Sequence, residues 1–564
     1  MQASFRRRML FVVAAAGSAA VVAALTVDGV PASAAQSKPL GQFKHLVVIY
    51  EENHSFDNLY GNWGSVGGKH VEGRADADAL HSTQVSQAGT PYACLMQNDV
   101  NLTSPPLSAL SGCDPETVTF PDGVTSVSYN SHFANAPFGI GDYIAPTDVT
   151  CPPNDNASHP ENGIDKNNPI PGSRPGGCTR DLVHRFYQEQ YQLDGGQQNR
   201  YTTGSDAVGL TQGYYDSAGL PIYQYLHANG APHYVIADQF FQGSFGGSFL
   251  NHQYLIAAQP PLWSGVPLSQ HALLDSNGFP NATYPLYKPT TTVRDGRAAQ
   301  QCGQTTTVAG FACGNWAVNT VQPQYPPTQG TSANNTLPAI DDTNADLTIG
   351  DRMSDAGISW AWYAGGWDDA EAGNPDPSFQ FHHQPFNYFQ RYAPGTPDRA
   401  AHLKDETDFL ADVAAGTLPK VSFVKPLGVE NEHPGYASET EGSGHLVDLI
   451  KAVTSGPQAG NTLVLVTYDE FGGQWDHVPP PGLGTAGAHD QFGPGTRIPA
   501  LLVSRSLTHS AVSHTVYDTT SIMATIEHQF GLAPVDPSAA GVVPRDRLVP
   551  DLTAAVAAGR PETP

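Results

Sequence analysis

Short apolar segments rich in β-branched and aromatic residues recur along the chain. Because they lack polar alternation, they are typical of strands buried on both faces, as in a parallel sheet covered by helices. The sequence therefore predicts strands over 45–50, 234–237, 358–363, 421–424, 463–468 and 498–504.

Two longer segments, 444–453 and 515–530, have the apolar spacing of helices that could cover such a sheet. The predicted fold class is α/β: a mainly parallel sheet with helices on both faces. Polar segments rich in Pro and Gly, near 62–180 and 261–345, are interpreted as long insertions that carry the cysteines. Since candidate site residues fall on both sides of them, we predict one domain over 35–564.

The first 34 residues have the pattern of a cleavable secretory signal. Three arginines at positions 6–8 precede an apolar segment over 9–25, and Ala32 and Ala34 flank a small-residue cleavage site. We predict cleavage after Ala34 and export by either the general or the twin-arginine route. The mature protein is then expected to be secreted or held in the cell envelope, without a segment inserted in the membrane.

The overall charge excludes some partners. The chain has 27 Lys and Arg against 53 Asp and Glu, a formal net charge of −26. An anionic protein is repelled by nucleic acid and by anionic membrane surfaces, so neither is an expected partner. The 40% hydrophobic content excludes a disordered chain.

Six cysteines, an even number, suit disulfides in an exported chain. None has C-x-x-C spacing, which removes the usual zinc and redox signatures. Sequential pairing closes short loops, although other connectivities stay open. The predicted bonds are Cys94–Cys113, Cys151–Cys178 and Cys302–Cys313.

Two predicted strands run directly into acidic residues. Glu52 and Asn53 follow strand 45–50, and Asp469 and Glu470 follow strand 463–468. The carboxyl ends of parallel strands gather at one edge, so both groups are expected in one crevice. Carboxylate and amide oxygens bind hard divalent cations, which predicts a metal site of open identity. The alternative is that the acids cap the helices that follow.

A glycine-rich segment containing Ser244 and Ser248 follows strand 234–237. Glycines let the backbone bring a hydroxyl close to a substrate, and the N–H groups that follow can receive a phosphate oxygen. Neither serine has the G-x-S-x-G pattern of α/β-hydrolases. The alternative is a glycine-rich turn without a catalytic role.

Several histidines in polar contexts could bind phosphate oxygens or protonate a leaving oxygen. Each could equally be a surface residue or a hydrogen-bonded core residue. The candidates are His184, His382, His383 and His433, with His477 near the second acidic group.

Three segments, taken in chain order, resemble the bacterial phosphoesterase family, which joins acid phosphatase A with the non-haemolytic type of phospholipase C. They are 52–57, 468–481 and 493–499. The resemblance extends from about residue 43 to about residue 530, and it implies an alkaline-phosphatase-like core that cleaves phosphoric esters through a hydroxyl beside a metal.

The resemblance also assigns residues to roles. Ser248 matches the nucleophile, in contact with the metal, while Ser244 lies in a similar context and stays an alternative. The metal-binding positions correspond to Glu52, Asn53, Asp469 and Glu470. The histidines that surround the phosphoryl group in acid phosphatase A correspond to His184, His382, His383 and His433.

The expected function is that of an exported, metal-dependent hydrolase of a small phosphate ester, closest to the acid phosphatase A branch. Ser248 would attack phosphorus, a histidine such as His433 would protonate the leaving alcohol, and water would hydrolyse the phosphoserine. A protonated histidine would favour mildly acidic pH.

Two alternatives stay open for this expected function. A phospholipase C-type phosphodiesterase is the first, for which aromatic residues near Trp360 could contact a choline group. A non-catalytic exported binding protein is the second. The oligomeric state and the physiological ester are also open.

Overall fold

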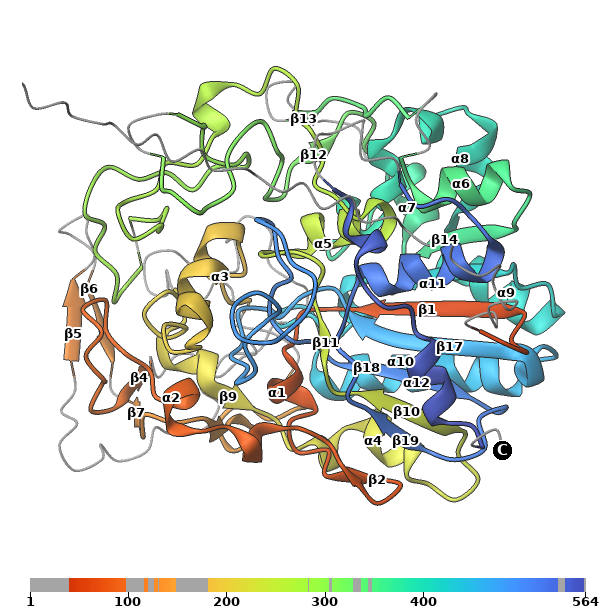
Figure 1. Cartoon of the computed structure of the whole chain (residues 1–564), viewed down its shortest axis with the longest axis horizontal. Helices are drawn as coiled ribbons and strands as arrows, with labels where there is room; N and C mark the ends of the chain where they lie inside the picture. The colour runs from red at the N-terminus through yellow and green to blue at the C-terminus, as the bar shows by residue number, and fades with distance from the viewer. Residues whose placement is uncertain are drawn as a thin grey trace, which may run out of the picture. The chain divides into compact units, whose positions relative to one another are not determined.

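A central eight-stranded sheet organises the computed structural model (Figure 1). The structure describes residues 40–97, 116–119, 126–129, 131–148, 181–282, 284–303, 307–327, 336–342, 347–535 and 543–561. The strand order is β15 (Leu403–Asp405), β14 (Trp360–Ala364), β16 (Val421–Lys425), β1 (His45–Glu51), β17 (Thr462–Tyr468), β18 (Ala500–Ser504), β10 (His233–Ala237) and β19 (Ala511–Ser513).

The sheet is mainly parallel, as predicted. Strand β1 pairs in parallel with both β16 and β17, and β18 runs antiparallel to both of its neighbours. All six predicted strands are present, displaced at their ends by no more than two residues. The edge strands β15 and β19 were not predicted, because three residues are too few to show a pattern.

Both faces of the sheet are covered. Every residue of β17 is buried, and successive side chains of a strand point to opposite faces. Two groups of helices provide this cover, and the helices within each group contact one another (Figure 1). One group contains α4 (Pro221–Leu226), α9 (Glu406–Ala415) and α10 (Glu439–Ser455), and the other α5 (Ser248–Ala257), α6 (Ile349–Asp355) and α11 (Thr520–Phe530). The predicted α/β class is confirmed.

The two predicted helices differ from the structure at their first residues. Segment 444–453 lies within α10, which begins earlier because Ser438 caps it by accepting a hydrogen bond from the Glu441 N–H. The prediction of helix from residue 515 was wrong. Tyr517 and Asp518 form strand β20, which pairs with β11 (Phe240–Phe241), and the Asp518 carboxylate then accepts the Thr520 N–H where α11 begins.

Shorter elements complete the described chain. The remaining helices are α1 (Phe56–Leu59), α2 (Ala79–Ser82), α3 (Phe186–Leu193), α7 (Trp367–Glu371), α8 (Pro397–His402) and α12 (Thr553–Ala558). Small ribbons are formed by β2 (Ser65–Val66) with β3 (Lys69–His70), β4 (Leu95–Gln97) with β7 (Ser131–Phe133), β5 (Glu116–Thr119) with β6 (Ser126–Tyr129), β8 (Phe138–Gly139) with β9 (Gly213–Tyr214), and β12 (Gln322–Pro323) with β13 (Thr336–Leu337).

One predicted disulfide, Cys302–Cys313, is confirmed, with a Cα–Cα distance of 5.0 Å. Cys94 is also disulfide-bonded, but its predicted partner Cys113 lies outside the described residues. The predicted pair Cys151–Cys178 and the predicted signal over residues 1–34 lie outside them as well. Within the described part of the chain, no helix has the length and apolar character needed to cross a bilayer.

Candidate active site

The acidic residues that follow β1 and β17 converge at one edge of the sheet. The two strands are parallel neighbours, and the Asp469 N–H donates to the Glu51 carbonyl at 3.0 Å, so both segments leave the sheet together. The four predicted metal-binding residues are all buried: Glu52, Asn53, Asp469 and Glu470. Parallel topology therefore places them in one crevice, as expected from their positions after strands.

Ser248 is the first residue of α5, and its hydroxyl faces this acidic group. Its Oγ donates to Glu470 Oε1 at 3.4 Å. The glycines before it are needed for close packing, because a Cβ on Gly247 would lie 2.8 Å from the His184 carbonyl oxygen. Gly246 also has a φ of +89°, which favours glycine. The loop thus brings Ser248 and His184 to the same site.

Ser244 has a different environment. It is fully buried, and its Oγ donates to Asn251 Oδ1 at 3.4 Å, inside the turn that precedes α5. Ser248 is therefore the serine with a hydrogen bond to one of the predicted metal-binding acids.

Glu189, on α3, holds the serine loop in place. Its carboxylate accepts the Gly246 N–H at 2.5 Å, the Gln242 amide at 3.0 Å and the Thr496 N–H at 2.8 Å. Burial raises the pKa of Glu189 to about 7. This residue was not among the sequence candidates, and it connects the loop before Ser248 to segment 493–499.

The four predicted histidines surround the same crevice. His383 contacts the Glu52 carboxylate through Nε2, and the His382 ring packs against the His383 ring at 4.8 Å. His184 Nε2 lies 3.5 Å from Glu470 Oε1. Burial lowers the pKa of all four rings, which disfavours the protonated histidine expected from the sequence.

His433 has a defined hydrogen-bonding pattern. Its Nδ1 lies 2.8 Å from the Pro434 carbonyl oxygen, and its Nε2 lies 3.0 Å from Asn53 Nδ2. Since the carbonyl can only accept, Nδ1 carries the proton and Nε2 accepts from the Asn53 amide. The Asn53 Oδ1 is left to face another donor or a cation.

Besides Glu189, two further residues of the site were missed in the sequence. Lys425 ends β16, with Nζ 2.8 Å from Glu52 Oε1 and 3.8 Å from Asp469 Oδ2. His252 lies one turn after Ser248 on α5 and donates through Nδ1 to the Ser248 carbonyl at 2.7 Å. The signal for Lys425 was available, because it follows the predicted strand 421–424 as the acids follow theirs.

The donor atoms fit a hard divalent cation. Asn53 Oδ1 and Asp469 Oδ1 are buried and lack a hydrogen-bond partner among the described residues. Burial raises the pKa of Asp469 to about 8 and that of Glu470 well above its usual range, and a bound cation would favour the ionised form of both. Oxygen atoms of carboxylates, an amide and a hydroxyl are the ligands such cations prefer.

A second buried charge network connects the three segments that carry the family resemblance. Arg497 is fully buried and pairs with Asp57 Oδ1 at 3.0 Å and with Asp476 Oδ1 at 3.1 Å. His477 Nδ1 lies 2.6 Å from Asp57 Oδ2. His477 therefore belongs to this network rather than to the crevice with Ser248.

His477 predicts a specific pH dependence of stability. Burial alone would lower its pKa, but Asp57 raises it above 6.5. The stabilisation by the protonated ring is therefore complete below pH 6.5 and is lost as the pH rises through the folded-state pKa. We expect His477→Gln to lower the unfolding free energy by about 1–3 kcal/mol below that pH and by less at about pH 9. Urea denaturation at several pH values across this range measures the difference in unfolding free energy between the unsubstituted protein and His477→Gln. A difference that grows with pH would contradict the prediction.

A cavity of about 290 Å³ opens beside Ser248. His184, Gly247 and Phe249 line it together with Asp181 and Asp206. Arg185 also lines it and pairs with Asp295 at 2.5 Å. A substituent of a bound ester would therefore meet a partly acidic wall with one aromatic side.

The chain is similar in part to several phospholipases C. It is 30% identical to phospholipase C B of Mycobacterium tuberculosis over 38% of this chain and 44% of that protein. It is 28% identical to a non-hemolytic phospholipase C of Pseudomonas aeruginosa over 33% and 30%, and 29% identical to non-specific phospholipase C6 of Arabidopsis thaliana over 22% and 29%. The chain thus matches less than half the length of each of these relatives.

Likeness to solved structures is weak. A member of the alkaline phosphatase superfamily from Vibrio parahaemolyticus aligns with a TM-score of 0.27 and 10% identity, over 60% of this chain and 67% of that chain. This likeness is too low to bear on function. The model of the phosphoesterase family, in contrast, matches residues 139–533, which include Ser248, Asp469 and Glu470. With well over half of its residues matched, this chain belongs to the phosphoesterase family.

Proposed function

We propose that this protein is an exported hydrolase of phosphoric esters that uses Ser248 as its nucleophile. The observation that carries the proposal is the contact of Ser248 Oγ with Glu470 at the start of α5, inside a buried group of metal-type donors. Membership of the phosphoesterase family and the named phospholipase C relatives support an ester of phosphoric acid as substrate.

The residues of the site have separate roles in the proposed reaction. A divalent cation held by Glu52, Asn53, Asp469 and Glu470 supplies positive charge for the phosphoryl group when bound. Ser248 Oγ forms the new bond to phosphorus while its proton passes by way of Glu470 Oε1 to His184 Nε2. The N–H groups at the start of α5 receive a phosphoryl oxygen.

The bond to the leaving oxygen then breaks. His184 donates through Nδ1 to the Leu182 carbonyl at 2.7 Å, so its Nε2 is free to take up the serine proton and then pass it to this oxygen. Water hydrolyses the phosphoserine in a second displacement, which returns the proton to the protein and frees Ser248.

For the substrate, we propose a phosphodiester of the phospholipase C type. Its second substituent needs room beside phosphorus, and the cavity lined by Asp181 and Asp206 next to His184 provides it. The carboxylates would favour a cationic substituent such as choline. The second candidate is a phosphomonoesterase like acid phosphatase, favoured by the four histidines around the crevice.

The two substrates are distinguished by comparing turnover of p-nitrophenylphosphorylcholine and p-nitrophenyl phosphate. We expect the diester to be preferred, and Asp181→Asn to lower kcat/KM for the diester at least about 10-fold more than for the monoester. Asp448→Asn, at an exposed position on α10, is the matched control. Preferred turnover of the monoester would support the phosphatase assignment, and turnover of neither substrate with divalent metals supplied would contradict both.

Removal of divalent cations should abolish activity. Treatment with a chelator is expected to lower turnover at least about 100-fold, because the buried carboxylates then lack the charge that positions the phosphoryl group. Re-addition of Mg²⁺, Ca²⁺ or Mn²⁺ in turn identifies the ion. A thermal unfolding scan gives a second readout, since an ion that binds the folded protein raises Tm.

Asp469→Asn provides the control for this metal experiment. This variant should lose both the activity and the rise in Tm on metal addition. Full activity in the presence of excess chelator would contradict the metal assignment while leaving Ser248 as the nucleophile testable.

A further inference from the structure

A second cavity, of about 330 Å³, lies at the end of α5 opposite Ser248. Ser248 begins this helix, while Gln253 and Ala257 from its later turns line the cavity. With a rise of about 1.5 Å per residue, Ala257 lies about 13 Å along the helix axis from Ser248. The cavity is therefore a separate feature of the molecule.

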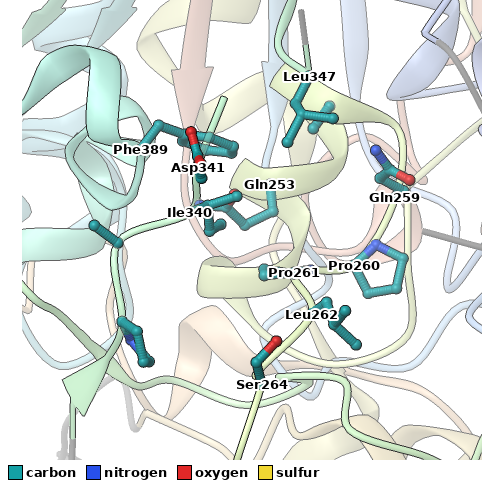
Figure 2. A pocket seen from close by; sticks show the side chains of 13 residues that line it. Gln253, Gln259, Pro260, Pro261, Leu262, Ser264, Ile340, Asp341, Leu347 and Phe389 are labelled. Atoms are coloured by element: carbon teal, nitrogen blue, oxygen red, sulfur yellow. The ribbon is translucent and has the colours of Figure 1, made fainter. Parts of the chain in front are cut away.

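The wall of this cavity is mainly apolar. Figure 2 shows α5, the segment that follows it and the segment around Ile340 arranged around the space. The apolar lining residues are Ala257, Pro260, Pro261, Leu262, Pro338, Ala339, Ile340, Leu347 and Phe389. A cavity of this size and lining is typical of a site for a small, mostly apolar ligand.

Backbone hydrogen bonds fix the wall in place. The Ile340 N–H donates to the Tyr388 carbonyl at 2.9 Å, and the Ile340 carbonyl accepts the Gln390 N–H at 2.8 Å. The cavity is thus bounded by paired backbone, as in a preformed ligand site.

Two buried amide oxygens of the wall lack a donor in the described part of the chain. Gln253 and Gln259 are 1% and 6% exposed, and the Oε1 atom of each lacks a hydrogen-bond partner among the described residues. The Gln253 Nε2 already donates to the Pro385 carbonyl at 3.4 Å, which fixes the orientation of this amide. A buried acceptor without a donor is costly, so these two oxygens indicate a ligand that donates a hydrogen bond.

The charge of the wall excludes an anionic ligand. Among the described lining residues, none is basic, and Asp341 is the single charged side chain. A fatty-acid carboxylate or a phosphate group would face the negative charge of Asp341 with no cationic partner among these residues. The complementary ligand is uncharged, with an apolar body and a hydroxyl group.

An exposed leucine lies in the wall of the cavity. Leu262 is 45% exposed, and Leu268, further along the same loop, is 62% exposed without lining the cavity. An apolar side chain that is both exposed and part of the wall suits a ligand whose hydrocarbon part reaches the protein surface.

From these observations we propose that this cavity binds a neutral aliphatic alcohol. The hydrocarbon chain occupies the apolar wall, and the hydroxyl group donates to the Gln253 or Gln259 amide oxygen. Such a group occurs both in soluble long-chain alcohols and in neutral lipids with a free hydroxyl, such as a diacylglycerol in a membrane.

The proposal is tested by calorimetric titration of the full-length protein with 1-octanol and, separately, with octanoate. We expect 1-octanol to bind with one-to-one stoichiometry and octanoate to bind at least about 10-fold more weakly. Equal binding of the two, or no binding of 1-octanol up to its solubility limit, would overturn the proposal.

Three variants locate the site. Ala339→Trp, at a half-buried position in the wall, should fill the cavity and abolish binding of 1-octanol. Leu262→Ser should weaken binding at least about 3-fold, and Leu268→Ser should leave it unchanged. Thermal unfolding of each variant confirms that it folds. If Leu268→Ser weakens binding as much as Leu262→Ser, or if Ala339→Trp still binds, the ligand is elsewhere and the proposal is wrong.

A further experiment distinguishes a soluble alcohol from a membrane lipid as the ligand. The protein is sedimented with phosphatidylcholine vesicles that contain or lack dioleoylglycerol. Retention that requires dioleoylglycerol and is lost in Ala339→Trp assigns a membrane lipid. Binding of 1-octanol without such retention assigns a soluble alcohol.

Discussion

Ser248→Ala should lower kcat for p-nitrophenyl esters at least about 1,000-fold while the protein stays folded. The hydroxyl supplies the atom that bonds to phosphorus, and no neighbouring group can take over this role at the start of α5 with the same geometry. Its loss removes one hydrogen bond, to Glu470 at 3.4 Å, so the effect on stability should stay below about 1 kcal/mol. Steady-state kinetics and urea denaturation measure the two quantities.

Ser244→Ala is the matched control for this prediction. Its Oγ contacts Asn251 rather than the acids, so kcat should change less than about 5-fold. The assignment of the nucleophile would be reversed if Ser244→Ala were inactive and Ser248→Ala retained turnover. Mass spectrometry of a quenched reaction provides a direct check, because a phosphoserine should be found at residue 248.

Arg497→Met should lower the free energy of unfolding by about 3–5 kcal/mol. The guanidinium is fully buried and holds Asp57 and Asp476, and its removal leaves two buried carboxylates without their cation. It also donates to the Asp238 carbonyl at 3.0 Å, which would lose its donor. Urea denaturation gives the change directly.

The control is Arg505→Met. Arg505 is exposed and donates hydrogen bonds to the Thr454 carbonyl at 3.4 Å and the Gly230 carbonyl at 2.7 Å, so its loss should cost less than about 1 kcal/mol. If Arg497 acts through charge, adding Asp57→Asn to Arg497→Met should restore part of the lost stability. A loss below about 1 kcal/mol for Arg497→Met alone would show that this network does not stabilise the fold.

The central strands could be predicted because burial on both faces leaves an uninterrupted apolar pattern. Strands β1 and β17 contain such runs, and their predicted bounds agree with the structure to within one residue. The edge strands could not be predicted from three residues each. The start of α11 was misplaced because the pairing of Tyr517–Asp518 with β11 is a contact between distant parts of the chain.

The candidate site, too, could be predicted only in part from the sequence. Glu52, Asn53, Asp469 and Glu470 follow recognisable strands, so their convergence at one edge could be expected from parallel topology. Lys425 has an equivalent position after β16, but its role depends on the neighbours that the sheet order gives it. Glu189 has no local signal, since its carboxylate is satisfied by loops distant in sequence.

The sequence by itself determined the α/β class, the strands of the central sheet and the residue types available for chemistry, because these depend on local apolar patterns and on short motifs. The tertiary structure decided which serine faces the acids, that His477 pairs with Asp57 instead of entering the crevice, and that Lys425 lies among the carboxylates. These features depend on sheet order and loop packing, which bring together side chains hundreds of residues apart and which no local pattern encodes.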